Sequence, residues 1–298
     1  MAPAQRENPD TQPLPAARDL PWKPLVWFGG LLVLGYAPVL YRLFRQWMDD
    51  PDMGHGLFVP LVAGYVVWEQ RRELISAPAA GNWLGLLVVL WGALQLAIAT
   101  LGVELFLART AFVISLVGVI LTVAGAQVAR KLAFPLFLLL FMVPIPAVIF
   151  NQITFPLQLL ASRLAELVLS VAGVPVFREG NILELPSQRL SVVEACSGIR
   201  SLLSLSFLSL VYAYFFDRDV WMRWVLLAAA VPIAITANAT RVTLTGLIGE
   251  YNKQLAEGFF HAAEGWVIFM LALLLLVLTH QFIRRAMTAA RTAREEAS

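Results

Sequence analysis

Long apolar runs separated by short polar segments make up most of the chain. Each run approaches or exceeds the roughly 20 residues that cross a bilayer as one helix. The runs are residues 24–44, 83–100, 108–126, 132–150, 196–216, 224–242 and 259–283. A shorter run at 56–68 spans if it is tilted, and a re-entrant loop is the alternative. Counting it as a span, the pattern predicts an all-α membrane protein built as an eight-span helical bundle.

Composition agrees with this class, because hydrophobic residues make up 59% of the chain and charged residues 14%. An ordinary water-soluble domain does not tolerate so much apolar surface. Residues 1–23 are rich in proline, alanine and polar side chains, which predicts a disordered cytoplasmic tail and not a signal peptide. The membrane domain is expected at 24–285, followed by a cytoplasmic tail at 286–298.

Arginine and lysine concentrate in alternate loops between the apolar runs. They are Arg71, Arg72, Arg130, Lys131, Arg218, Arg223, Arg284, Arg285, Arg291 and Arg294. The other loops carry acidic groups, for example Asp50 and Glu104. Basic residues accumulate on the cytoplasmic side of short loops, so both termini are predicted to be cytoplasmic. Cys196, Arg241 and His261 then lie at the outer ends of their spans.

The segment 151–195 departs from the spanning pattern. Apolar residues recur at helical spacing over 151–171, with Gln158, Arg163 and Glu166 between them, which favours an interfacial helix on the outer surface over another span. Further on, the apolar runs 176–178 and 182–185 flank a Glu-Gly-Asn turn, and 190–193 is a third such run. We therefore predict a small outer β-hairpin insertion within a sheet that leads into the cysteine.

Cys196 is the only cysteine, and its neighbours indicate a reactive thiol. Glu194 precedes it, Ser197 and Gly198 follow it, and Arg200 comes four residues later. On a helix that starts near Cys196, Arg200 shares its face. A helix N-terminus and a nearby cation both favour the thiolate, which is the nucleophilic form. The alternative is a free cysteine that packs as a small core residue.

Two further polar groups of residues interrupt the last apolar runs. Asn238 and Arg241 lie three apart in Asn-Ala-Thr-Arg, and an arginine within a span usually faces a protein interior or a wet cavity. The alternative is an arginine that reaches out to the lipid head groups. His261 opens the last run, with Glu264 one turn later. His55, in Met-Gly-His-Gly, is a competing outer histidine, since a base must be able to reach the thiol.

These motifs resemble the exosortases and, more broadly, the exosortase/archaeosortase group of membrane transpeptidases. The resemblance is carried by ACSGIRSL at Ala195–Leu202, by NATR at Asn238–Arg241 and by His261. It extends to the His-Gly pair at 55–56, to VPIP at 143–146 and to GNILELP at 180–186. The resemblance implies that Cys196 is the nucleophile, His261 the general acid/base and Arg241 the group that stabilises the carbonyl oxygen. Supporting roles are expected for Glu194, Ser197, Gly198, Arg200, Asn238, Glu264 and His55.

The resemblance also implies a cysteine transpeptidase or endopeptidase at the outer face of a prokaryotic cytoplasmic membrane. Its expected partners are membrane lipids and secreted proteins that end in a short motif, often Pro-Glu-Pro, a transmembrane helix and a basic tail. No metal or other cofactor is required for such chemistry. A net charge of +2 gives no indication of a nucleic-acid partner. The acceptor, which is water or an amine, and the oligomeric state stay open.

Two functions of other classes remain as alternatives. In a transporter or lipid-head-group carrier, Arg200, Arg241 and Glu264 would line a pathway and Cys196 would be incidental. The grouping of the polar residues at one depth argues against it. A non-catalytic factor for envelope polysaccharide assembly or protein export is the other alternative.

Overall fold

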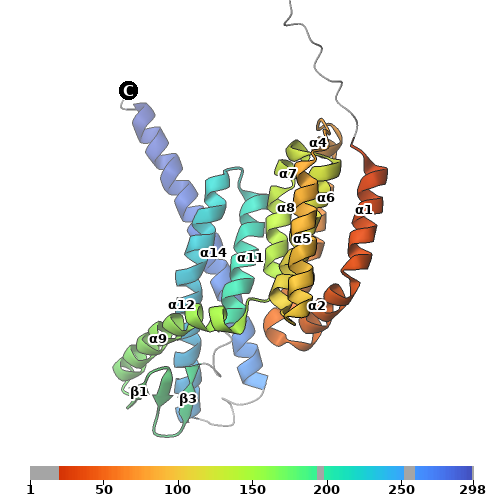
Figure 1. The fold of residues 1–298 in the computed structure, drawn as a ribbon. Coiled ribbons are helices and arrows are strands. Elements are labelled where there is room, and N and C mark those ends of the chain that lie inside the picture. The colour runs from red at the N-terminus through yellow and green to blue at the C-terminus, as the bar shows by residue number, and fades with distance from the viewer. Residues whose placement is uncertain (1–19, 193–197, 252–258, 297–298) are drawn as a thin grey trace, which may run out of the picture. The chain divides into compact units, whose positions relative to one another are not determined.

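The computed structural model describes residues 20–192, 198–251 and 259–296. Most of the described elements are α-helices, joined by short loops and one small sheet (Figure 1). The chain forms two compact units. One comprises Met1–Asp49 and Gly56–Val143, and the other comprises Asp50–His55 and Pro144–Ser298.

The first unit is entirely helical over its described residues. Its elements are α1 (Trp22–Gly35), α2 (Ala37–Asp49), α3 (Phe58–Glu69), α4 (Arg71–Ile75), α5 (Leu84–Leu101), α6 (Leu105–Val123), α7 (Ala126–Lys131), α8 (Ala133–Leu138) and the short 3₁₀ helix η2 (Leu139–Met142). Small residues let α5 and α6 pack closely, as in many membrane helix pairs. A β-carbon on Gly118 would lie 2.7 Å from the backbone nitrogen of Val89.

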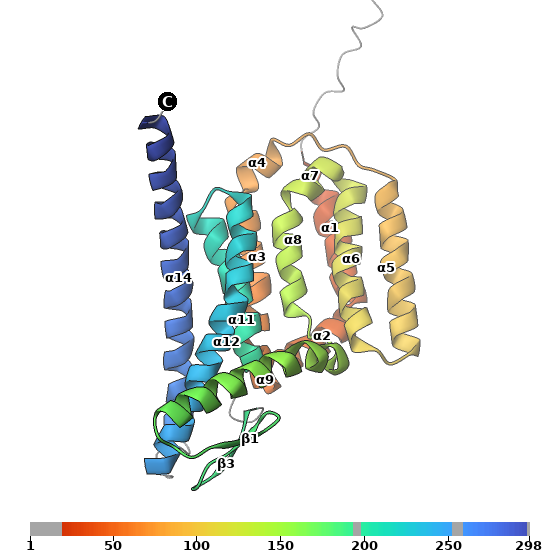
Figure 2. The same cartoon turned by 90° about the vertical axis from the view of Figure 1, so that its left-hand side faces the viewer.

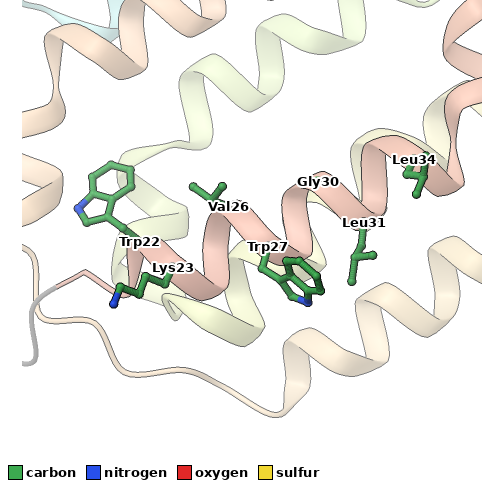
Figure 3. A pocket seen from close by; sticks show the side chains of 7 residues that line it. All are labelled: Trp22, Lys23, Val26, Trp27, Gly30, Leu31 and Leu34. Carbon is green, nitrogen blue, oxygen red and sulfur yellow. The ribbon is translucent and has the colours of Figure 1, made fainter.

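One face of α1 is apolar and open. Its side chains line a shallow hollow along the helix (Figure 3). The lining residues are Trp22, Lys23, Val26, Trp27, Gly30, Leu31 and Leu34. Trp27 is 68% exposed and Leu34 71% exposed, which a membrane helix tolerates because lipid covers such a face.

The first predicted span, 24–44, is not one straight helix. It consists of α1 and α2, which are bent by 71° at Tyr36. Pro38 has no N–H to donate to the carbonyl of Leu34, so the helix is interrupted at this point. The hydroxyl group of Tyr36 lies 2.8 Å from Oγ of Ser115 on α6, which holds the corner in place.

The fifth predicted span, 132–150, is also wrong in its extent. Helical structure ends at Met142, and Pro144 and Pro146 separate it from the next helix. A residue that precedes proline disfavours the α-helical conformation, and proline itself cannot continue a helix. Residues 147–150 belong instead to α9 (Ala147–Val171) of the second unit.

Five helices among the described residues are long and apolar enough to cross a membrane. They are α5, α6, α9, α12 (Val220–Tyr251) and α14, and the bent pair α1–α2 raises the number to six. Shorter apolar helical stretches lie at Ala133–Met142 and Leu202–Phe216. The chain is therefore a multi-pass membrane protein, while its helices do not match the eight predicted spans one for one.

The core of the second unit lies between α11 (Gly198–Phe216), α12 and α14 (Phe259–Glu296). These three helices run alongside one another (Figure 1). The long helix α9 instead runs across α12, near the end of α12 at which the sheet lies (Figure 2). Although α9 is long and apolar enough to span, its direction within the second unit differs from that of α11, α12 and α14.

The sheet has three antiparallel strands, which lie at or close to the three runs from which a small sheet was predicted. They are β1 (Phe177–Glu179), β2 (Ile182–Glu184) and β3 (Arg189–Ser191), in the order β1-β2-β3. Gly180 has φ of +63°, as required at the first central position of the type II′ turn that joins β1 to β2. Leu183 and Leu190 are paired across β2 and β3, and both pack in one core with Val242 of α12.

Candidate active site

Three helix ends lie toward the same end of the second unit, where the site residues were predicted (Figures 1 and 2). α11 begins at Gly198, α12 ends at Tyr251 and α14 begins at Phe259, all at the end of the second unit that carries the sheet (Figures 1 and 2). Glu194, Cys196 and Ser197 lie outside the described residues. The start of α11 follows Cys196 by two residues, as expected for a thiol near a helix N-terminus.

Arg241 is buried inside the second unit, with 9% of its surface exposed. It belongs to a stripe of buried residues along α12, spaced three or four apart. The stripe includes Leu226, Ala230, Ala234, Ala237 and Arg241. Alanine side chains let a neighbouring helix approach closely. This burial argues against an arginine that reaches out to lipid head groups.

The guanidinium group of Arg241 lies against Gly265 of α14. A β-carbon on Gly265 would be 3.5 Å from both Cζ and Nη2 of Arg241. The guanidinium thus fills the space into which a side chain longer than that of alanine would extend from position 265. This contact was not predicted, although a glycine four residues after His261 was a visible signal.

Two of the other predicted residues can be placed relative to this contact. His261 lies four residues before Gly265, so both occupy one face of α14. At 1.5 Å per residue they are separated by about 6 Å along the helix. Asn238 lies half-buried on α12, one turn before Arg241. The structure therefore brings the buried cation next to the helical turn that carries His261.

The remaining predicted residues are described only through the backbone. Gly198 and Arg200 lie in the first turn of α11, and Glu264 lies in the second turn of α14. The side chains of Arg200, His261 and Glu264 are not among the described groups. Their interactions with the thiol therefore remain predictions.

His55 lies in the short 3₁₀ helix η1 (Pro51–Leu57) and is half-buried. The segment Asp50–His55 belongs to the same compact unit as α9, α11, α12 and α14. His55 thus remains a competitor of His261 for the role of base. Asp50 lies in the same segment.

The β2–β3 turn is attached to the last turns of α12, next to the site. Ser187 donates a 2.6 Å hydrogen bond from Oγ to Oε1 of Glu250, and its backbone nitrogen donates to the same oxygen. Gln188 packs directly on Gly249, where any side chain would collide with it. The sheet is thereby held against the helix that carries Arg241.

A second polar cluster, absent from the prediction, lies near the middle of α14. Nε2 of His280 donates a 2.9 Å hydrogen bond to Asp217, and Nδ1 lies 3.0 Å from the hydroxyl group of Tyr212. Nε of Arg284 is 3.3 Å from the same Asp217 oxygen. Burial acts to raise the pKa of Asp217, but the backbone N–H of Asp219, His280 and Arg284 together hold it below its ordinary value.

Comparison with known proteins agrees with the sequence motifs. A family profile described as transmembrane exosortase (Exosortase_EpsH) matches residues 47–278, which include all three motifs and most of the described helices. No curated protein matches the chain. No solved structure matches it either.

Proposed function

Because the chain belongs to the transmembrane exosortase family, we propose that it is a cysteine-dependent enzyme that processes C-terminal sorting signals of secreted proteins. The observation that carries the proposal is the buried Arg241, placed against Gly265 one turn from His261. A fixed cation of this kind is what a developing oxyanion requires. The motif that contains Cys196 leads into α11, and α11 packs against α12, the helix that carries Arg241.

The reaction begins when the Cys196 thiolate attacks the carbonyl carbon of the scissile peptide bond. A bond forms between sulfur and carbon, and the negative charge that develops on the carbonyl oxygen is stabilised by Arg241. His261 takes the thiol proton and gives it to the leaving amine as the carbon–nitrogen bond breaks. Water or an amine then attacks the thioester and releases the thiolate. Water makes the enzyme an endopeptidase, and an amine makes it a transpeptidase.

The proposed topology places this chemistry at the outer face of the cytoplasmic membrane, with both termini in the cytoplasm. Its main support is the alternation of basic and acidic loops along the chain. We retain eight crossings, formed by the long helices, the bent α1–α2 pair and the shorter apolar segments. α9 lies in the outer interface, as its orientation across α12 suggests.

The proposed substrates are secreted proteins that end in a short motif, a transmembrane helix and a basic tail. A reporter protein with a C-terminal Pro-Glu-Pro motif, such a helix and such a tail tests this directly. Membranes containing the enzyme are expected to shorten the reporter at its C-terminus. Mass spectrometry of the product identifies both the cleaved bond and the group that resolves the thioester.

Substitution of the nucleophile is the decisive test. Cys196→Ala and Cys196→Ser are expected to abolish processing while the protein still inserts into the membrane, because a hydroxyl group is far less acidic than a thiol. An impermeant thiol reagent should label the unsubstituted enzyme from outside, since Cys196 is its only cysteine. Processing by either variant, in cells without a second copy of the enzyme, would refute the cysteine mechanism.

A further inference from the structure

The strand β3 has one edge that pairs with β2 and a second edge that pairs with no strand among the described residues. The backbone of Leu185 donates to Gln188, and that of Val192 donates to Asn181. Leu183 pairs with Leu190 in the same register. The backbone N–H and C=O groups of residues 188, 190 and 192 therefore point toward β2. In an antiparallel pair the alternate residues face away. Arg189 and Ser191 therefore direct their backbone N–H and C=O groups to the second edge.

These outward groups are unused within the described part of the chain. No described residue donates a hydrogen bond to the carbonyl of Arg189 or Ser191 or accepts one from their N–H groups. An open strand edge is a template for another extended chain. Peptide-binding domains use such edges to hold a peptide as an added strand.

The position of β3 connects this edge with the candidate active site. β3 ends at Ser191, five residues before Cys196, and five residues extend over at most about 17 Å. Val192, directly after β3, is fully buried in one cluster with Val242, the neighbour of Arg241. The strand therefore precedes the nucleophile by five residues in the chain and leads into the cluster that contains the neighbour of Arg241.

The sheet is held rigidly enough to act as a template. Nε of Arg178 on β1 donates a 2.6 Å hydrogen bond to Glu166 of α9. Ser162 of α9 donates to the carbonyl of Gly180 in the β1–β2 turn. At the other turn, Ser187 is bound to Glu250 of α12. Both ends of the sheet are thus fixed to helices of the second unit.

We propose that the open edge of β3 binds the extended segment of the substrate that contains the scissile bond, as a fourth strand beside Arg189 and Ser191. This inference rests on the proposed function and names the way in which that site holds its substrate. Backbone hydrogen bonds place the segment, and the chain then continues to the thiol. Side chains on alternate substrate positions point to opposite faces of the extended sheet.

Disulfide trapping tests this arrangement, because Cys196→Ala leaves the chain without any cysteine. In this background Ser191→Cys introduces a thiol on β3. The control is Phe177→Cys, which introduces a thiol on β1, away from the open edge of β3, at a position that is 65% exposed. The probe is the reporter protein with single cysteines placed in turn along its motif. Neighbouring strands lie about 4.8 Å apart, within the reach of a disulfide between their residues.

Ser191→Cys is expected to cross-link at every second substrate position, with at least tenfold more product than Phe177→Cys. Equal cross-linking from both variants, or no alternation along the substrate, would overturn the added strand. If the unsubstituted enzyme cleaves the reporter but Ser191→Cys traps none of it, the edge-binding inference fails and the proposed function stands. If the reporter is never cleaved, both fail.

A synthetic substrate gives an independent measurement on the enzyme with Cys196 intact. N-methylation of one backbone amide at a time removes a hydrogen-bond donor without changing a side chain. Loss of one such bond is expected to raise KM about fivefold to tenfold. This should occur at alternate positions only, with little change in kcat. A uniform effect at every position would contradict pairing with β3.

Discussion

His280 and Asp217 form a buried hydrogen bond of 2.9 Å at one end of the α14 face that meets Arg241 at its other end. This face is continuous, with buried or close-packed residues three or four positions apart. They are Gly265, Ile268, Ala272, Leu276 and His280. The hydrogen bond at one end and the packing of Arg241 on Gly265 at the other therefore restrict the rotation of α14 about its axis, and with it the direction of the turn that carries His261.

The Asp217 cluster is expected to stabilise the protein from a distance of about 28 Å along α14 from His261. Asp217→Ala removes the partner of His280 and Arg284 from a buried site, which typically costs about 3 kcal/mol or more. The midpoint of thermal unfolding in detergent should fall accordingly. Leu278→Ala, at an exposed position of the same helix, is the matched control. Equal midpoints for Asp217→Ala and the control would show that the cluster contributes nothing.

The same cluster predicts a dependence of stability on pH. Hydrogen bonds and the charge of Arg284 hold the pKa of Asp217 in the folded protein below its ordinary value of 3.8. Ionised Asp217 thus contributes stability that is complete above that pH and is lost as the pH falls through the lower folded pKa. The stability difference between the unsubstituted protein and Asp217→Asn should persist from pH 7 to about pH 4 and shrink below it. Unfolding midpoints measured over this range check the sign, and a constant difference down to pH 2 would contradict it.

Gly265 is expected to tolerate alanine but not leucine. An added β-carbon lies 3.5 Å from the Arg241 guanidinium, which is an ordinary contact distance, whereas a longer side chain must displace it. Processing should change less than about threefold in Gly265→Ala and fall about a hundredfold or more in Gly265→Leu, in line with the loss of an oxyanion donor. Unfolding midpoints separate this effect from misfolding. Full activity of a folded Gly265→Leu would argue against a catalytic position of Arg241.

Arg241→Lys is expected to be nearly as damaging as Arg241→Ala. Lysine keeps the charge but loses the planar group that lies on Gly265 and can hold two oxygens at once. Initial rates of reporter processing, normalised to the enzyme in the membrane, provide the comparison. Recovery of most of the activity by lysine would reduce Arg241 to a point charge or a structural anchor.

The two candidate histidines should differ in their effects. His261→Ala is expected to eliminate turnover, since His261 lies one turn from the residue that contacts Arg241. His55→Ala should impair processing less, mainly through substrate entry, because His55 lies on the short helix η1 and not in the core formed by α11, α12 and α14. Single-turnover assays that detect the thioester place each residue in acylation or deacylation. Loss of turnover in His55→Ala alone would reverse the assignment.

Local sequence patterns predicted much of this arrangement. The apolar runs, the extended segments before Cys196 and the start of α11 were all visible in the sequence because each depends on neighbouring residues. Burial of Arg241 followed from the cost of an arginine within an apolar span. These features require no knowledge of distant contacts.

The features that were missed depend on residues far apart in the chain. The bend at Tyr36 has a local cause in Pro38, but the hydrogen bond that holds it comes from Ser115, 79 residues later. Asp217 and His280 are separated by 63 residues, and neither carries a local signal for the other. Gly265 has a role only because Arg241 packs on it. Such pairings arise from how helices pack, which hydrophobic periodicity does not specify.

The helix α14 is longer than a membrane crossing requires. The helix has 38 residues, or about 57 Å, roughly twice the thickness of the hydrocarbon layer, and its second half continues into a basic stretch. A tilt of α14 on substrate binding would move its two ends in opposite directions about the core contact with α12. A spectroscopic label near Arg294 would therefore report such a tilt from a position more than 30 residues beyond His261.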